Sequence, residues 1–188
     1  MPLSLRTVHS DTDFNALIQL EHLSYTNPPN RIWRLFRHDA SPAGFIEVRD
    51  RQMREFRNDP TARWLKVVDT DIGDQVVGAA LWNTYTENPY PVYEEHPVEA
   101  DWWPEDLPFL FVHPEHRRRG IGRQLVDWGV KEADRLNLEA FIEATDLGKV
   151  TYEACGFVYA GTNYLESAKR NSSQKWRELE AFMDFLFV

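Results

Sequence analysis

Hydrophobic and polar positions along the first half of the chain predict strands and helices in alternation. Residues 3–8 alternate between apolar and polar side chains like a half-buried strand, and residues 64–69 and 75–82 are predicted as two further strands joined by a hairpin connection. Apolar side chains at three- and four-residue spacing, as in amphipathic helices, occupy residues 11–24 and 42–58. Ser41 and Pro42 supply a cap and a first-turn proline for the second helix, and Gly73 suits the hairpin turn between the second and third strands.

The second half of the chain continues this order around a glycine-containing segment. Residues 109–112 are apolar like a buried strand, the chain turns at Pro114, and an amphipathic helix follows the loop that holds Gly120 and Gly122. Further strands are predicted at residues 138–144, 157–165 and 176–188. A helix start after a glycine loop favours anion binding, because its N–H groups lack intrahelical partners and the helix dipole is positive there. We therefore expect a pyrophosphate at this loop.

Two short motifs resemble those of one enzyme family. Arg117-x-x-Gly120-x-Gly122, preceded by Val112-His113-Pro114, resembles the acetyl-CoA signature of the GCN5-related N-acetyltransferases (GNAT). Residues 148–157, GKVTYEACGF, resemble the family's short helix ending in Y-x-x-x-G-F. A Walker loop and a dinucleotide fingerprint fit less well, because the Gly-Lys-Ser/Thr ending of the first and the third glycine of the second are missing.

The resemblance implies a fold, a cosubstrate and a reaction. The fold would be a single α/β domain over residues 1–188, with a mixed, mostly antiparallel central sheet flanked by helices. The cosubstrate would be acetyl-CoA, with direct acetyl transfer to a primary amine. By the resemblance, the coenzyme-binding residues are Leu110, Phe111, Val112, Arg117, Arg118, Arg119, Gly120, Ile121, Gly122, Arg123, Asp146 and Tyr152. Asp146 and Arg118 depart from the family pattern, which usually has Asn and often Gly at these positions.

Two proton transfers define the catalytic candidates. An alkyl ammonium group with a pKa near ~10 is neutral in about one molecule in a thousand at pH 7, so the acceptor must lose a proton before it attacks the thioester. The family position for this base is Asp106, with Glu105 in reserve, although Asp106 can equally be the acidic end of a loop. Tyr152 matches the family's tyrosine, which protonates the leaving thiolate or only packs on the coenzyme. Cys155 is expected to be a small core residue, and His113 is a weaker candidate for the base.

Residues 83–108 form an irregular insertion of distinct composition. It contains seven acidic residues, five prolines, five Tyr or Trp residues and neither Lys nor Arg. One interpretation is a solvated acidic loop whose aromatic rings pack on the sheet edge. The other is a lid over the acceptor site, which would attract a cationic amine through its field and through cation–π contacts.

Composition excludes several other classes of protein. The formal net charge of −9 argues against a nucleic-acid-binding surface, and no apolar run approaches the ~20 residues that span a bilayer. The N-terminal segment lacks a signal peptide's apolar centre, so we expect a cytoplasmic protein, with a nuclear location also open because of residues 117–119. One cysteine excludes an internal disulfide, and the two close histidines of the turn are too few for a zinc site, so no metal is expected.

The predicted function is acetyl transfer from acetyl-CoA to a small cationic amine. A peptide or protein amine is the alternative acceptor, and a degenerate acetyl-CoA sensor is the non-enzymatic alternative. The sequence identifies neither the acceptor nor the oligomeric state, although many relatives form homodimers through their late strands.

Overall fold

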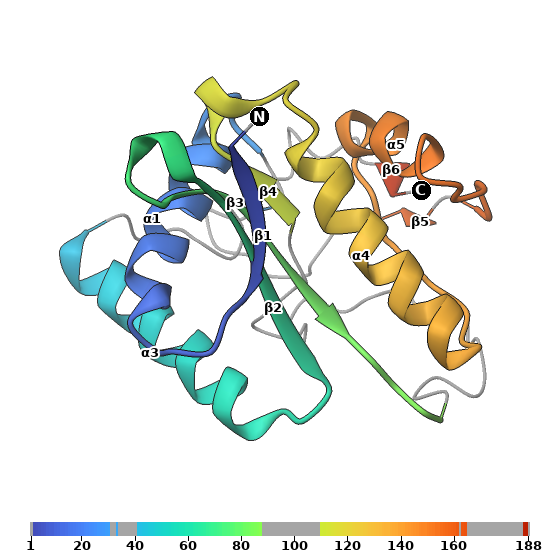
Figure 1. Ribbon diagram of the computed structural model, residues 1–188, viewed down its shortest axis with the longest axis horizontal. Coiled ribbons are helices and arrows are strands. Elements are labelled where there is room, and N and C mark those ends of the chain that lie inside the picture. The colour runs from blue at the N-terminus through green and yellow to red at the C-terminus, as the bar shows by residue number, and fades with distance from the viewer. Residues whose placement is uncertain are drawn as a thin grey trace, which may run out of the picture.

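The computed structural model describes residues 2–30, 33, 41–87, 110–161, 163–164 and 186–187. In this part of the chain, four antiparallel strands form a sheet in the order β1-β2-β3-β4 (Figure 1). The strands are β1 Leu3–Thr7, β2 Ala62–Asp69, β3 Gln75–Asn83 and β4 Leu110–Val112. The first three confirm the strands predicted at residues 3–8, 64–69 and 75–82, and the sheet flanked by helices confirms the predicted α/β fold.

The β2–β3 hairpin forms as its turn sequence predicts. A short 3₁₀ helix, Thr70–Ile72, follows β2, and Gly73 then takes a left-handed conformation with φ of 75°. Residues with a Cβ rarely adopt this conformation, so glycine is the residue that fits the turn. The hairpin brings Asp69, the last residue of β2, opposite Gln75.

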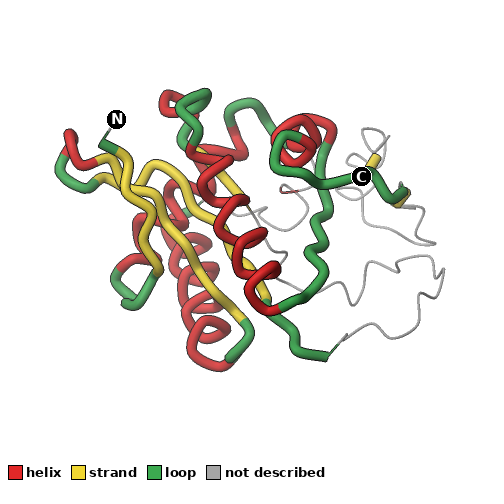
Figure 2. Tube along the Cα trace, turned by 45° about the vertical axis from the view of Figure 1, so that its right-hand side comes forward, coloured by secondary structure: helices red, strands yellow, loops and turns green. Residues whose placement is uncertain are grey.

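Helices cover both faces of the sheet, as Figures 1 and 2 show. The helices α1 Asp13–Thr26 and α3 Pro42–Asn58 lie on one face, and α4 Ile121–Leu136 lies on the other. The core on the α1 side is built from Val8, Phe14, Leu17, Leu20, Trp64, Ala79 and Phe111. The core on the α4 side is built from Leu65, Val67, Val77, Ala80, Ile121 and Leu125. Ser41 caps α3 as predicted, because its side chain accepts a hydrogen bond from the Gly44 amide.

The predicted strand at residues 138–144 is wrong. These residues follow the left-handed Asn137 at the end of α4 in an irregular conformation, and Phe141 leaves 82% of its surface exposed. Alternation provides an apolar face, but a strand forms only where a neighbouring backbone offers hydrogen-bond partners, and these residues join no ladder in the described part of the chain.

The late strands are described only at two short segments. β5 Asn163–Tyr164 pairs antiparallel with β6 Leu186–Phe187 in a separate two-stranded sheet, and both lie within segments predicted as strands. Residues 157–161, predicted as the start of a strand, are irregular. All of the strand pairs that the structure describes are antiparallel, so the parallel part of the expected mixed sheet is not seen there.

Candidate functional site

The glycine loop joins β4 to the first turn of α4. The chain leaves β4 through a 3₁₀ turn, Pro114–His116, and Gly120 caps α4 with a positive φ of 79°. The first intrahelical hydrogen bond runs from the Gln124 amide to the Gly120 carbonyl, at 3.0 Å. The amides of the preceding helical residues therefore have no partner inside the helix, which is the geometry that binds an anion.

Three elements converge on Gly122. A Cβ added there would lie 3.7 Å from Thr151 Cγ2, 3.8 Å from Leu110 Cδ2 and 4.0 Å from Val112 Cγ2. Leu110 and Val112 belong to β4, and Thr151 belongs to α5 Asp146–Glu153, so β4, α4 and α5 meet at this glycine. The two sequence motifs, about thirty residues apart, are thereby brought to one place.

The edge of β4 that faces away from β3 carries backbone groups that do not pair with β3. The His113 amide bonds the Val77 carbonyl at 2.9 Å, and antiparallel alternation then directs the backbone groups of Leu110 and Val112 away from β3. The Leu110 carbonyl accepts from the Tyr25 hydroxyl at 2.9 Å, and the Val112 carbonyl accepts from Arg117 Nε at 3.3 Å. The Val112 N–H lies on the same edge, where an amide-containing ligand could pair with the strand.

The three consecutive arginines have three different environments. Arg117 Nη2 donates to the Ser24 carbonyl at 2.8 Å, and burial lowers the pKa of Arg117. Arg119 Nη1 donates to Asp69 Oδ2 at 2.7 Å. Arg118 is exposed in a left-handed conformation with φ of 63° and makes no hydrogen bond or ion pair with the described residues. Arg118 is thus the arginine of the three that is best placed to meet a phosphate.

Two predicted coenzyme contacts can be made only by backbone. Phe111 and Ile121 are both at most 2% exposed, and their side chains belong to the two cores.

Arg123, one turn into α4, is exposed, and its Nε lies 3.6 Å from Asp127 Oδ2. Asp146 begins α5, and its side chain lies outside the described part of the chain.

Tyr152 lies on α5 and is partly buried. Its ring lies 6.1 Å from the ring of Phe157 and packs closely on Gly148, where an added Cβ would be 3.0 Å from Tyr152 Cε2. Burial raises the pKa of Tyr152 to about 12, with a smaller contribution from Cys155. The phenol therefore holds its proton at neutral pH, as an acid for a leaving thiolate must.

Tyr25, near the end of α1, is a site residue that the sequence did not indicate. Its ring stacks on Trp33 at 5.9 Å, and its hydroxyl bonds β4 at Leu110. Burial raises the pKa of Tyr25 well above its ordinary value, and Glu21 and Tyr152 raise it further. No motif contains Tyr25, because its role depends on packing between residues 85 positions apart.

The surroundings of Cys155 oppose a nucleophilic role, and a turn of the backbone engages one ring nitrogen of His113. Burial and the neighbouring Asp127 carboxylate raise the pKa of the Cys155 thiol, which opposes formation of a thiolate. His113 Nδ1 accepts a hydrogen bond from the Glu115 amide at 3.2 Å and so caps the turn after β4. Burial lowers the pKa of His113.

The remaining catalytic candidates and the insertion lie largely outside the described residues. Asp106, Glu105 and the insertion beyond residue 87 are not described. Within the described ranges, no three His, Cys, Asp or Glu side chains form a group that could hold a metal ion. None of the described helices is both long and apolar enough to cross a membrane.

Comparison with known proteins identifies the family. The model of the acetyltransferase (GNAT) family matches residues 29–157, which is more than half of the chain. The chain belongs to this family. The glycine loop, β4 and α5 all lie within the matched region, so the resemblance of the two motifs to those of this family is confirmed.

Solved structures of acetyltransferases share this fold. The chain is 15% identical to a ribosomal-protein-S5-alanine acetyltransferase from Vibrio fischeri, with a TM-score of 0.59 over 87% of this chain and 84% of that one. It is 12% identical to glucosamine-6-phosphate N-acetyltransferase from Arabidopsis thaliana, with a TM-score of 0.57 over 92% and 100% of the two chains.

The curated relative is the probable acyltransferase SID5 of Ajellomyces capsulatus. It is 39% identical over 41 residues, which are 22% of this chain and 30% of that protein. The matched segment thus spans less than a third of the curated relative.

Proposed function

We propose that this GNAT acetyltransferase transfers an acetyl group from acetyl-CoA directly to a primary amine, with a small cationic amine as the acceptor. The observation that supports it best is the convergence of β4, α4 and α5 on Gly122, beneath a helix start capped by Gly120. We also assign residues 1–188 to one domain, with residues 83–108 as a lid over the acceptor site.

The coenzyme's phosphates and its pantetheine arm would use different parts of this region. The pyrophosphate would accept hydrogen bonds from the first-turn amides of α4, and Arg118 would supply a mobile positive charge from the loop. The amide-rich arm would pair with the outer edge of β4 at Val112. Gly122 leaves the space between these contacts open, because a larger side chain there would project toward Leu110, Val112 and Thr151.

Acetyl transfer then requires proton movements at both the amine and the sulfur. Asp106, or Glu105 in its place, takes one proton from the alkyl ammonium group; the neutral nitrogen then attacks the thioester carbonyl, forms the C–N bond and loses its second proton to solvent. As the C–S bond breaks, Tyr152 donates its phenolic proton to the coenzyme's sulfur and regains one from solvent. The pKa of about 12 keeps Tyr152 in the donating form throughout the neutral range.

The charge of the insertion supports a cationic acceptor. Its seven acidic residues, unrelieved by Lys or Arg, create a negative field, and its Tyr and Trp rings add surfaces that attract cations. A peptide amine is the second candidate acceptor. The two solved relatives act, by their names, on a ribosomal protein and on an amino-sugar phosphate, so the shared fold supports either class of acceptor.

A thiol-release assay tests the proposed function. Acetyl-CoA would be incubated with the protein and with parallel panels of small amines and peptides, and free thiol would be measured. We expect turnover with small diamines or polyamines. Turnover with peptides alone would replace the small acceptor by a peptide, and coenzyme binding without turnover on either panel would indicate a sensor.

The variant Gly122→Val provides the matched test of the coenzyme site. The branched side chain would fill space meant for the coenzyme, so we expect coenzyme binding to be lost while circular dichroism still reports the folded state. Calorimetry would measure the affinity. Unchanged affinity would contradict the assignment of the coenzyme to this loop.

A further inference from the structure

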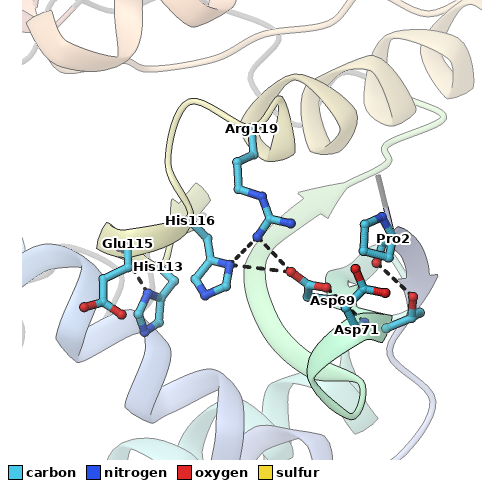
Figure 3. Close-up of polar contacts among 8 residues, drawn as sticks. Pro2, Asp69, Asp71, His113, Glu115, His116 and Arg119 are labelled. Atoms are coloured by element: carbon cyan, nitrogen blue, oxygen red, sulfur yellow. Dashed lines mark hydrogen bonds and ion pairs between the residues drawn. The ribbon is translucent and has the colours of Figure 1, made fainter.

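Asp69 ties the glycine loop to a distant part of the sheet. It ends β2, is 3% exposed, and its Oδ2 accepts a hydrogen bond from Arg119 Nη1 at 2.7 Å. Its Oδ1 accepts from the Asp71 amide at 3.1 Å, which fixes the carboxylate in the β2–β3 turn. Figure 3 shows Arg119 reaching from the start of α4 toward this carboxylate.

His116 completes the cluster. Its Nδ1 lies 2.6 Å from Arg119 Nη1 and 3.8 Å from Asp69 Oδ2 (Figure 3). A guanidinium nitrogen can only donate, so Nδ1 must act as an acceptor and carries no proton in this arrangement. The groups that face His116 among the described residues are Asp69, Arg119 and the His113 ring, whose centroid is 4.9 Å away.

The cluster holds one side of an unusual loop. Arg118 and Gly120 both have positive φ, and Arg119 lies between them. Arg117 is bound on the other side through the Ser24 carbonyl of α1. The two side chains that flank Arg118 are therefore fixed to different elements, and the loop conformation depends on both attachments.

We propose that Asp69, Arg119 and His116 are positioning residues, which hold residues 117–122 in the coenzyme-binding conformation and release this hold when His116 is protonated. The inference rests on the proposed coenzyme site. Arg119 would then bind the Asp69 carboxylate and make no contact with a phosphate of the coenzyme.

Protonation of His116 would weaken the cluster for a geometric reason. A proton on Nδ1 removes the acceptor that Arg119 uses and places a cation beside the guanidinium. The imidazolium would also compete with Arg119 for Asp69 Oδ2. Coenzyme affinity should therefore fall at pH values low enough to protonate His116.

The variant Asp69→Asn separates the positioning role from simple electrostatics, because the two predict opposite changes in coenzyme affinity. Removing a negative charge near a phosphate site should by Coulomb's law strengthen anion binding. Loss of the Arg119 anchor should instead weaken coenzyme A binding, and we expect the Kd from calorimetry at pH 7.5 to rise at least tenfold. Equal or tighter binding by Asp69→Asn would overturn the proposal.

Asp74→Asn is the matched control. Asp74 lies in the same hairpin and also binds an arginine, with both oxygens 2.9 Å from the guanidinium of Arg6, but this pair is exposed and far from the loop in sequence. We expect its Kd for coenzyme A to stay within twofold of wild type. A loss equal to that of Asp69→Asn would mean a general effect of the hairpin and would also overturn the proposal.

His116→Asn tests the pH dependence and serves if Asp69→Asn does not fold. The Asn carbonyl can accept a hydrogen bond in place of Nδ1 but does not titrate. Titration of the coenzyme itself affects both proteins equally between pH 7.5 and 5.5. Over that range, wild type should lose three- to tenfold more affinity than His116→Asn. Parallel pH profiles would contradict the role of His116. Absence of coenzyme binding by wild type would overturn the proposed function itself, whereas normal wild-type binding with unaffected variants overturns only this inference.

Discussion

At the scale of single residues, Arg118 is distinguished from its two neighbours by exposure. Arg117 and Arg119 are each bound to protein groups, while Arg118 extends from a left-handed position toward solvent. We predict that Arg118→Gln raises the KM for acetyl-CoA about five- to thirtyfold, because a charge-assisted contact to phosphate contributes about 1–2 kcal/mol. The melting temperature should stay unchanged.

Steady-state kinetics at two salt concentrations would measure this effect. Arg135→Gln is the control, because Arg135 is an exposed arginine at the other end of α4, paired with Glu132. A similar rise in KM for both variants would point to the overall charge of the protein instead of a contact at the loop.

Tyr152 is predicted to act through its proton. Tyr152→Phe should lower kcat by roughly 10²-fold, the scale of a positioned general acid, with coenzyme affinity nearly unchanged. Since burial raises the pKa to about 12, the acid form persists as the pH rises, and wild-type kcat should show no alkaline loss due to Tyr152 below about pH 11. A normal kcat for the variant would leave Tyr152 with a packing role only.

At the scale of elements, the contact between α4 and β3 determines the position of the glycine loop. The indole of Trp82 lies directly against the α4 backbone at Gly129, where an added Cβ would overlap the ring, and Trp82 Nε1 bonds the Leu125 carbonyl at 3.2 Å. At the other end of the helix, the Ile121 side chain packs closely on Gly78 of β3. Small residues therefore let the helix approach the sheet and position the loop.

Gly129→Ala should destabilise the fold by about 1–3 kcal/mol, the usual cost of an overpacked core, despite the better helix propensity of alanine. Chemical denaturation would measure the change. Gly122→Ala is the matched control in the same helix, because its Cβ would meet neighbours at ordinary distances of 3.7–4.0 Å. Equal stability of the two variants would contradict close packing at Trp82.

At the scale of the whole molecule, the net charge of −9 is unevenly distributed along the chain, and the insertion carries seven acidic residues. If the insertion recruits a cationic acceptor, changing Glu94, Glu95 and Glu99 together to Gln should raise the KM for the amine several-fold. Wild-type KM for the amine should also rise with salt, because exposed charges are screened over about 8–10 Å at physiological ionic strength. The KM for acetyl-CoA should barely move.

Kinetics with both substrates varied would separate these effects. Unchanged amine KM in the triple variant and in the salt series would remove the support for a cationic acceptor and identify the insertion as a solvated loop.

The sequence by itself determined the features that depend on neighbours along the chain. The apolar pattern and the turn residues predicted β1, β2 and β3, the Ser41-Pro42 cap placed α3, and Gly73 and Gly120 occupy the left-handed positions of two turns. The spacing of two motifs was enough to identify the family. These are local properties, because a backbone conformation or a helix period is set within a few residues.

Only the tertiary structure decided which residues meet at the site. Arg117 bonds the Ser24 carbonyl 93 positions away, Arg119 bonds Asp69 50 positions away, and Tyr25 bonds β4 across 85 positions. The same limit explains the wrong strand at residues 138–144, since a strand needs a partner that its own sequence does not specify. An arginine in a phosphate motif can bind a ligand or the protein itself, and the choice depends on which acceptor the fold brings within reach.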